Sequence, residues 1–238
     1  MSARAPQRNP RAGFFVTGTD TGVGKTRAAA ALVRALARHG ISVAAMKPVA
    51  AGAAVSVEGL RNDDALELMH AANTHAPYAD VNPYCLAAPV SPHLAAADAG
   101  VCIDIGVIVS RFAALAARAD CVVVEGAGGW LAPIGFDETM ADVAQALALP
   151  VVLVVGLRLG CLNHALLTAG AIKASGLPLA AWIANAIDPH FERAAENVAT
   201  LERLLAMKPL ALIAHGAPGE AEIKSESAAA LLTSSRAR

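Results

Sequence analysis

Short apolar runs alternate along the chain with longer stretches in which apolar residues recur at helical spacing. Several short runs are apolar at every position, as in Val122–Val124 and Val151–Val155, which is typical of strands covered on both faces by helices. The predicted strands are Gly13–Gly18, Ile41–Met46, Cys121–Glu125, Pro150–Gly156, Leu179–Ala186 and Leu210–Ala214. The predicted helices are Lys25–His39, Asp64–Ala72, Ile105–Ala119, Asp142–Leu149, Asn163–Ser175 and Arg193–Leu205.

This alternation predicts one α/β domain with a doubly wound, mostly parallel sheet and helices on both faces. Gly40 and Gly176 stand at the ends of two predicted helices, where left-handed backbone favours glycine. We expect the domain to span residues 13–225, between a flexible segment 1–12 and a frayed tail 226–238. Ligands of such folds bind at the carboxyl ends of the strands, so the loops there are the first place to look for chemistry.

Composition excludes several classes of protein. Hydrophobic residues make up 55% of the 238 residues and charged residues 16%, which excludes intrinsic disorder. The 19 basic and 20 acidic residues leave a formal net charge of -1. Because nucleic-acid binding requires an excess of positive charge, we expect no nucleic-acid partner.

Signals for a membrane or for secretion are weak. The longest stretch without a charged residue, 81–97, contains Pro83, Pro89 and Pro92 and does not predict a spanning helix. Residues 1–12 carry arginines but lack the apolar core of a signal peptide. The 4 cysteines have no metal-ligand spacing, which favours reduced thiols. We therefore expect a cytoplasmic protein without a membrane partner.

The loop after the first predicted strand, TDTGVGKT at residues 19–26, has the features of a phosphate-binding loop. In such loops backbone N–H groups surround a phosphate, and the following helix contributes the positive end of its dipole. Lys25 would reach the β- and γ-phosphates and the Thr26 hydroxyl would bind Mg²⁺. The strict pattern has glycine where this chain has Thr19. The loop predicts an ATP site in a fold of the P-loop NTPase type.

Asp20 distinguishes between branches of this class. Switch ATPases of the plasmid-partition kind carry a second lysine five residues before the cradle lysine, whereas this chain has an acid there. Because the charge is opposite, the sequence favours a different branch. A partition-type switch ATPase remains an alternative.

Further candidate residues follow other predicted strands. Lys47 in MKPVAAG ends the second strand and is expected to face the nucleotide. Asp63 and Asp64 precede a helix, where one acid suffices to cap it and the other is free for a metal. Glu125 ends a buried strand, where this class keeps a Mg²⁺ ligand. The glycines after it, Gly126, Gly128 and Gly129, allow a ligand to approach the backbone.

Two more segments have both a functional and an ordinary interpretation. Gly160–Asn163 begins a predicted helix, whose free N–H groups make either an anion site or a water-bonded helix start. Asn185 ends the strand in WIANAIDP and either hydrogen-bonds an adenine edge or belongs to a turn before Pro189. Position alone does not separate these interpretations.

Taken together, these segments resemble the dethiobiotin synthetase family. The resemblance covers residues 13–190 and rests on FFVTGTDTGVGKT, MKPVAAG, GLRNDDAL, NPYCLAAPVSPH, VVVEGAGGW, LPVVLVVGLRLGCLNHALLT and WIANAIDP, in this order. It implies an ATP-dependent cyclo-ligase that converts 7,8-diaminononanoate, CO₂ and ATP to dethiobiotin, ADP and phosphate. The implied path runs through a carbamate and a carbamoyl-phosphate mixed anhydride. The family also implies a homodimer with a site shared across its interface.

The resemblance assigns roles to individual residues. The implied ATP-binding residues are Thr21, Gly22, Val23, Gly24, Lys25, Thr26, Asp64, Glu125, Gly126, Ala127, Gly128, Asn185 and Ala186. The implied Mg²⁺ ligands are Thr26, Asp64 and Glu125, and the implied catalytic cations are Lys25 and Lys47. The implied substrate-binding residues are Lys47, Ala51, Gly160, Cys161, Leu162 and Asn163, of which the last four would bind the substrate carboxylate from the partner subunit.

The chain departs from the family pattern at two places. Ala51 stands where the family often has a substrate-contacting serine, and LIAHGAPG at residues 212–219 replaces an adenine-side loop that usually ends in Ile-Pro. The second departure leaves the nucleotide preference open. A cobyrinate-type amide synthetase is a further alternative, but it would need a glutaminase domain as a source of ammonia.

Overall fold

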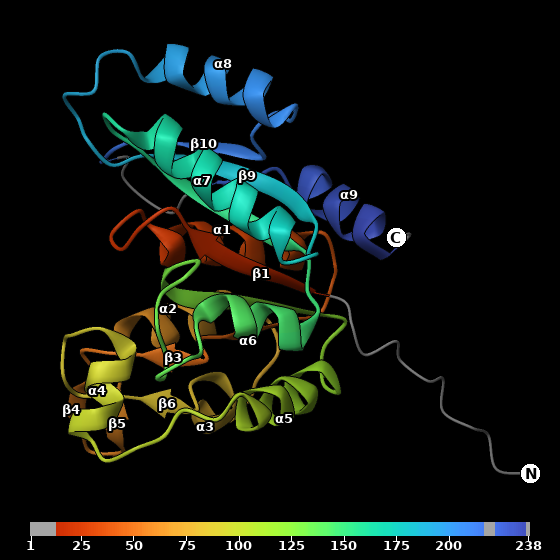
Figure 1. Ribbon diagram of the computed structural model, residues 1–238. Helices are drawn as coiled ribbons and strands as arrows, with labels where there is room; N and C mark the ends of the chain where they lie inside the picture. Colours follow the sequence, from red (N-terminus) through yellow and green to blue (C-terminus); the bar gives the residue numbers. More distant parts are fainter. Residues whose placement is uncertain (1–12, 217–221, 237–238) are drawn as a thin grey trace, which may run out of the picture.

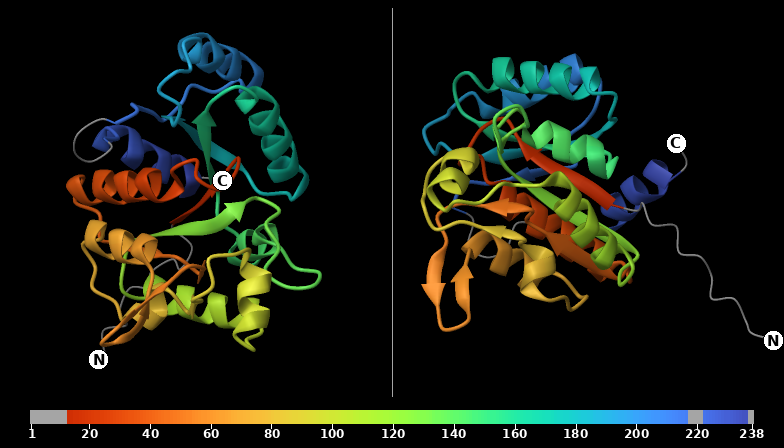
Figure 2. Two further views of the ribbon diagram at one scale, coloured as in Figure 1. Left: turned by 90° about the vertical axis from the view of Figure 1, so that its left-hand side faces the viewer. Right: turned by 60° about the horizontal axis from the view of Figure 1, so that its bottom comes forward.

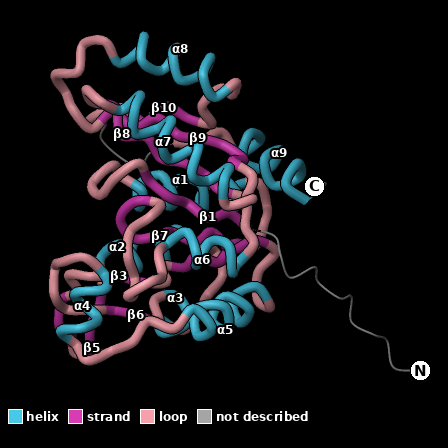
Figure 3. The backbone as a smooth tube through the Cα atoms, viewed as in Figure 1, coloured by secondary structure: helices cyan, strands magenta, loops and turns pink. Residues whose placement is uncertain are grey.

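A six-stranded sheet runs through the middle of the protein, as seen in the computed structural model, which describes residues 13–216 and 222–236 (Figure 3). Its strands are β1 (Gly13–Gly18), β2 (Val43–Met46), β7 (Cys121–Gly129), β8 (Val151–Leu157), β9 (Leu179–Ala186) and β10 (Ala211–Ile213). The strand order is β10-β9-β8-β1-β7-β2, and every neighbouring pair is parallel. The predicted fold class, a doubly wound α/β domain with a mostly parallel sheet, is confirmed.

The two faces of the sheet carry separate apolar cores. Side chains alternate along β1, so Phe14 and Val16 belong to one core and Phe15 to the other. One face is covered by α1 (Lys25–Arg38), α2 (Asp63–Ala71) and α9 (Ser225–Arg236). The other is covered by α5 (Ile105–Ala116), α6 (Met140–Leu147), α7 (Cys161–Ala174) and α8 (Ala194–Leu205). Figure 1 and the left view of Figure 2 show the two layers.

Between β2 and α5 the chain forms small elements that the apolar pattern did not predict. They are β3 (Val49–Ala50), β4 (Ala54–Ser56), β5 (Gly59–Arg61), α3 (Tyr78–Val81), β6 (Tyr84–Cys85) and α4 (Pro92–Asp98). Strand β3 pairs with β6, and β4 with β5, outside the main sheet. They lie together beside the β2 edge (Figure 1, lower left). Strands of two or three residues are too short to leave a periodic signal.

The strand order reverses at β1, which is where such folds bind ligands. From β1 the chain passes to β2 on one side, whereas β8, β9 and β10 are added on the other. The β1–β7 ladder is irregular at its carboxyl end, since Val16 pairs with Glu125 but Gly18 pairs with Gly129. The residues between them, 126–128, therefore leave the regular register beside the phosphate-binding loop.

Helix α9 differs from the expected frayed tail at residues 226–238. Residues 225–236 form a helix whose Ala228 and Leu232 are buried in the same core as α1. The five consecutive apolar residues 228–232, flanked by polar ones, show no helical period from which to predict this helix. The expected flexible segment, 1–12, lies outside the described residues. No helix within 13–216 and 222–236 combines the length and the apolar character that a membrane crossing requires.

Candidate functional site

The loop from β1 to α1 is shaped by two glycines in left-handed backbone, Gly22 with φ 75° and Gly24 with φ 83°. A Cβ atom on Gly24 would lie 2.1 Å from Asn185 Nδ2, so a side chain does not fit there. Thr19 is not among the residues with positive φ, and its N–H donates to the Val154 carbonyl over 3.0 Å. Threonine therefore replaces the glycine of the strict pattern without strain.

Lys25 begins α1 and lines an open cleft. Its ammonium donates to the Asp20 carbonyl over 2.9 Å. Burial, together with the positive charge of Lys47, lowers the pKa of Lys25 to about 8. The Asp20 carboxylate accepts from the Thr21 N–H over 2.7 Å and pairs with Arg158 at 2.6 Å. These contacts fix the loop around the lysine.

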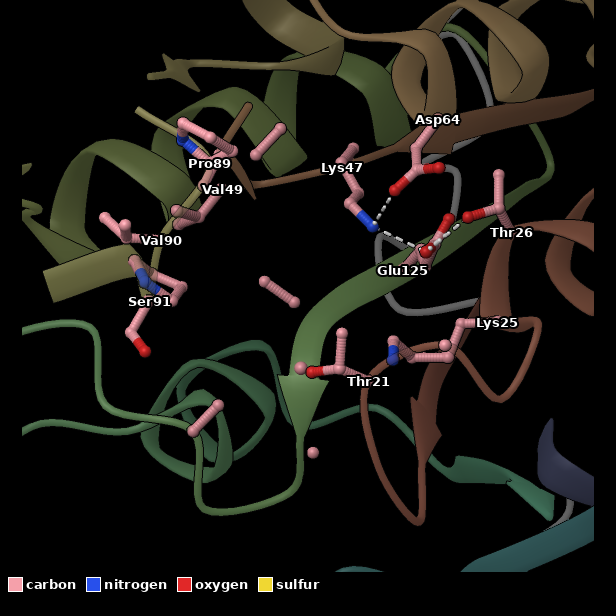
Figure 4. Close-up of a pocket in the computed structure, with 18 of the residues that line it drawn as sticks. Thr21, Lys25, Thr26, Lys47, Val49, Asp64, Pro89, Val90, Ser91 and Glu125 are labelled. Carbon is pink, nitrogen blue, oxygen red and sulfur yellow. Dashed lines mark hydrogen bonds and ion pairs between the residues drawn. The ribbon is translucent and has the colours of Figure 1, made fainter. Parts of the chain in front are cut away.

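A second lysine, Lys47, sits among carboxylates on the same side of the cleft as Lys25 (Figure 4). Lys47 follows β2, and its Nζ lies 2.5 Å from Glu125 Oε1 on β7 and 2.9 Å from Asp64 Oδ2 on α2. The Thr26 hydroxyl donates to the same Glu125 oxygen over 2.9 Å. Four elements of the fold, β2, α2, β7 and α1, therefore bring their side chains to one point.

Burial makes this cluster electrostatically strong. The side chains of Lys47 and Glu125 are 5% and 1% exposed. Burial alone would lower the pKa of Lys47, but Glu125 and Asp64 outweigh it and raise that pKa. Burial would likewise raise the pKa of Asp64, but Lys47 outweighs it and lowers that pKa, whereas burial raises the pKa of Glu125. Lys47 is therefore a permanently charged cation of the cleft.

The residues predicted to bind Mg²⁺ fit a hard cation. Thr26, Asp64 and Glu125 offer hydroxyl and carboxylate oxygens, and the buried Oε2 of Glu125 has no hydrogen-bond partner. No group of three or more His, Cys, Asp and Glu side chains in the described part of the chain is arranged to hold a metal ion. A cation here would need further ligands, and Mg²⁺ in nucleotide sites takes them from phosphates and water.

These groups line one cleft of about 730 Å³. The lining residues that the sequence singled out are Thr21, Gly22, Gly24, Lys25, Thr26, Lys47, Ala51, Asp64, Glu125, Ala127, Gly128 and Gly129. The lining residues that it missed are Val49, Ala50, Pro89, Val90, Ser91, Pro92, Ala132 and Pro133. Figure 4 shows Pro89, Val90 and Ser91 across the cavity from Lys47. The segment PVSP, residues 89–92, contains two prolines, which indicate a rigid loop and could have pointed to this part of the cleft.

Asn185 and the residues of Gly160–Asn163 do not line this cleft in the single chain. Asn185 is buried behind the phosphate-binding loop, where its Nδ2 donates to the Val23 carbonyl over 2.8 Å and its Oδ1 has no partner. Three other residues predicted to bind ATP also do not line the cleft. Val23 is buried, Gly126 packs against Phe15, and Ala186 is the last residue of β9. Gly160–Asn163 starts α7, with Gly160 at φ 94°. The loop 212–219 is described as far as residue 216, and the rest of it lies outside the described residues.

Comparison with solved structures supports the fold. MinD of Aquifex aeolicus is similar, with 17% identity, a TM-score of 0.56 and coverage of 95% of this chain and 97% of that chain. A ParA family ATPase from Chlorobium tepidum is similar at 14% identity, with a TM-score of 0.50 and coverage of 94% and 90%. At such low identity these likenesses show a P-loop NTPase fold alone.

Comparison with protein families and curated proteins is more specific. A family model described as an AAA domain matches residues 12–216. The ATP-dependent dethiobiotin synthetase BioD of Xanthomonas oryzae is 54% identical over 194 residues, which cover 82% of this chain and 87% of that protein. BioD 1 of Salmonella typhi is 49% identical over 192 residues, covering 81% and 84%. The chain therefore belongs to the dethiobiotin synthetase family of ATP-dependent ligases, which act in biotin biosynthesis.

Proposed function

We propose that this chain joins 7,8-diaminononanoate and CO₂ at the expense of ATP to give dethiobiotin, ADP and phosphate. The observation that carries the proposal is the shared cleft of Lys25 and Lys47. One lysine belongs to a phosphate-binding loop, and the other is fixed beside it by Glu125 and Asp64. A switch ATPase of the plasmid-partition kind would carry its second lysine in the phosphate-binding loop itself, where this chain has Asp20.

The chemistry requires two cations because two anions must meet. One amine of the substrate adds to CO₂ and loses a proton, which gives a carbamate. A carbamate oxygen then attacks the γ-phosphorus, and ADP leaves. The second amine attacks the carbonyl carbon of the mixed anhydride, loses its proton and expels phosphate, which closes the five-membered urea. Lys47 would stabilise the carbamate and Lys25 the phosphates. The open cleft beside the lysines would hold the reacting groups together.

Thr26, Asp64 and Glu125 would hold Mg²⁺ beside the phosphates. The ion would neutralise part of the triphosphate charge while the carbamate approaches. The lone buried Oε2 of Glu125 supports this assignment, because a buried carboxylate oxygen without a partner is costly. Asp64 supplies the second carboxylate from the first turn of α2.

Asn185 would select adenine through its oxygen. One N–H of its Nδ2 donates to the Val23 carbonyl, whereas its Oδ1, which accepts hydrogen bonds, has no partner. An acceptor suits the 6-amino group of adenine and opposes the 6-oxo group of guanine. We therefore infer that ATP is preferred over GTP, with Ala186 beside the base.

The substrate would lie along Ala51 and the PVSP loop. Ala51 provides a methyl group where a serine hydroxyl would have bound the substrate, so that hydrogen bond is lost. The carboxylate would bind at Gly160–Asn163 of a partner subunit in a homodimer. Exposed Leu166 and Leu167 on α7 support this arrangement, since they give this helix an apolar outer face.

The decisive experiment incubates the protein with diaminononanoate, bicarbonate and Mg-ATP and follows dethiobiotin by mass spectrometry. We expect dethiobiotin and ADP in equal amounts, and turnover at least about 10²-fold lower in Lys47→Ala because a cation facing the carbamate is lost. ATP hydrolysis without dethiobiotin would instead support a switch ATPase. Replacing ATP by GTP tests the assignment of Asn185.

Subunit exchange tests the shared site. Gly160→Asp would repel the substrate carboxylate, and Lys47→Ala damages the other half of the site. Mixed dimers of these inactive variants would contain one intact site, so about a quarter of all sites should recover activity under random pairing. If no activity returns after native mass spectrometry has confirmed exchange, each site is complete within one chain.

A further inference from the structure

Helix α3 and the residue that caps it hold the backbone of Lys47 from both sides. The Lys47 N–H donates to the Val81 carbonyl over 2.8 Å. The Lys47 carbonyl accepts from Asn82 Nδ2 over 2.7 Å. Asn82 is 2% exposed. The backbone of Lys47 is therefore fixed not only by its own strand but also by residues 81 and 82, which are far from it in sequence.

The hydroxyl of Tyr78 connects this segment to the helix that carries Asp64. Tyr78 Oη accepts from the Asn62 N–H over 2.8 Å and donates to Asn82 Oδ1 over 2.9 Å. Asn62 is the N-cap of α2, and its side chain accepts from the Ala65 N–H over 3.3 Å. An unbroken chain of hydrogen bonds thus runs from the start of α2, through Tyr78 and Asn82, to the carbonyl of Lys47.

The Tyr78 side chain is itself held in place. The Arg61 guanidinium lies 4.2 Å from the centre of its ring. Burial, with the Cys85 thiol 3.4 Å from the hydroxyl, raises the pKa of Tyr78 to about 12. The phenol therefore keeps its proton at neutral pH and remains the donor to Asn82.

We propose that Tyr78 and Asn82 are positioning residues that hold Lys47 and Asp64 as one unit for the ligase reaction. The inference rests on the proposed function, because its measured consequence is the rate of dethiobiotin formation. The Lys47 ammonium lies 2.9 Å from Asp64 Oδ2 only while the strand end and α2 keep their spacing. A displacement of about 1 Å at a reacting group can cost up to about 10²-fold in rate. The phosphate-binding loop makes no direct hydrogen bond to Tyr78 or Asn82, so the affinity for ATP without Mg²⁺ should not depend on them.

The test substitutes Tyr78→Phe, which removes the hydroxyl and keeps the ring over which Arg61 lies. We expect kcat for dethiobiotin to fall about 10-fold, with an unchanged Kd for ATP measured without Mg²⁺. Tyr84→Phe is the matched control, because the Tyr84 hydroxyl also accepts a backbone N–H, that of Asp104 over 2.9 Å, but has no link to the cleft. Its kcat should stay within about 2-fold of the wild type even if both variants lose similar stability.

A double-mutant cycle separates positioning from general damage. If Tyr78 acts largely through Lys47, Tyr78→Phe should lower the residual rate of Lys47→Ala by less than about 3-fold. An equal loss in both backgrounds, or an unchanged kcat in Tyr78→Phe, overturns the inference while leaving the proposed function intact. Absence of dethiobiotin with the wild-type chain overturns both. If Tyr78→Phe does not fold, Asn82→Ala is measured in its place, with the same expectations for kcat and ATP affinity.

Discussion

Lys47 stabilises the fold as well as the proposed chemistry, and this dual role has a measurable consequence. Replacing it in Lys47→Met keeps a side chain of similar length but removes the charge. Glu125 then remains buried with a single hydrogen bond, from Thr26, and without a cation. We expect the folded state to be strongly destabilised, and we expect a second substitution, Glu125→Gln, to restore much of the loss.

The magnitude follows from the geometry. Two unit charges 2.5 Å apart attract each other by about 7 kcal/mol at an effective dielectric constant of about 20. In the wild type this attraction offsets the desolvation of both groups. Removing one partner of a buried pair leaves the other desolvated, at a cost of about 3–5 kcal/mol. For a domain of this size such a loss lowers Tm by about 10 °C.

The pH dependence of stability provides a second signature. Without Lys47, the pKa of Glu125 in the folded state is raised still further above its value in the unfolded chain. The resulting destabilisation is complete above the folded-state pKa and disappears as the pH falls towards the unfolded-state value of about 4.3. The difference in stability between the wild type and Lys47→Met should therefore be large at pH 8 and shrink towards pH 5.

The free energy of unfolding of the wild type, of Lys47→Met and of the double variant is measured by urea denaturation followed by circular dichroism. The expected order of stability at pH 8 is wild type, then Lys47→Met with Glu125→Gln, then Lys47→Met alone. Asp64 remains in the double variant, but its side chain is 44% exposed and is stabilised by water. If Lys47→Met is as stable as the wild type, or if the double variant is no better than the single one, the ion pair does not hold the site together.

Three shorter predictions concern other residues. Asp64→Asn should lower turnover at least about 10-fold more than Asp63→Asn, because Asp64 lines the cleft whereas Asp63 is exposed; the reverse order would contradict the assignment. ATP affinity, measured by calorimetry, should weaken about 10-fold from pH 7 to pH 9 as Lys25, with its pKa of about 8, loses its proton, whereas Lys25→Arg should show no such change. Ala148→Gly should raise stability by about 0.5 kcal/mol in urea denaturation, since Ala148 has φ 51°; a loss would mean that its methyl group contributes to packing.

The sequence was most informative where structure depends on neighbours along the chain. Strands such as Cys121–Glu125 have a continuous apolar pattern, and the phosphate-binding loop has a local motif, so both were predictable. Because parallel strands end on one side of the sheet, Lys47 and Glu125 could also be placed together in advance. Their ion pair and its burial were not predicted, since these depend on the packing of four separate elements.

The sequence was least informative between β2 and α5. Strands β3 and β6 contain two residues each and exist only because they pair with one another. Tyr78 belongs to no motif, and Asn82 begins the segment NPYCLAAPVSPH without a role being assigned to it. Their importance is visible only from hydrogen bonds across sixteen and thirty-five positions of sequence. Spacing alone left the choice between Asp63 and Asp64 open, and only the resemblance to the family named Asp64, which lines the cleft in the structure.

The central position of β1 has a consequence for synthesis on the ribosome. Phe15 lies opposite Val124 on one side and Val151 on the other, so β1 cannot enter a sheet until both partner strands have been translated. Contacts of such long sequence separation form slowly, and the nascent strand, which is fully buried in the finished protein, meanwhile exposes its phenylalanines to chaperones or to other chains. ATP cannot assist at this stage, because the loop that binds phosphate takes its shape from those same late strands. The phosphate-binding loop is thus translated early, but it takes its final shape only after the later strands have been made.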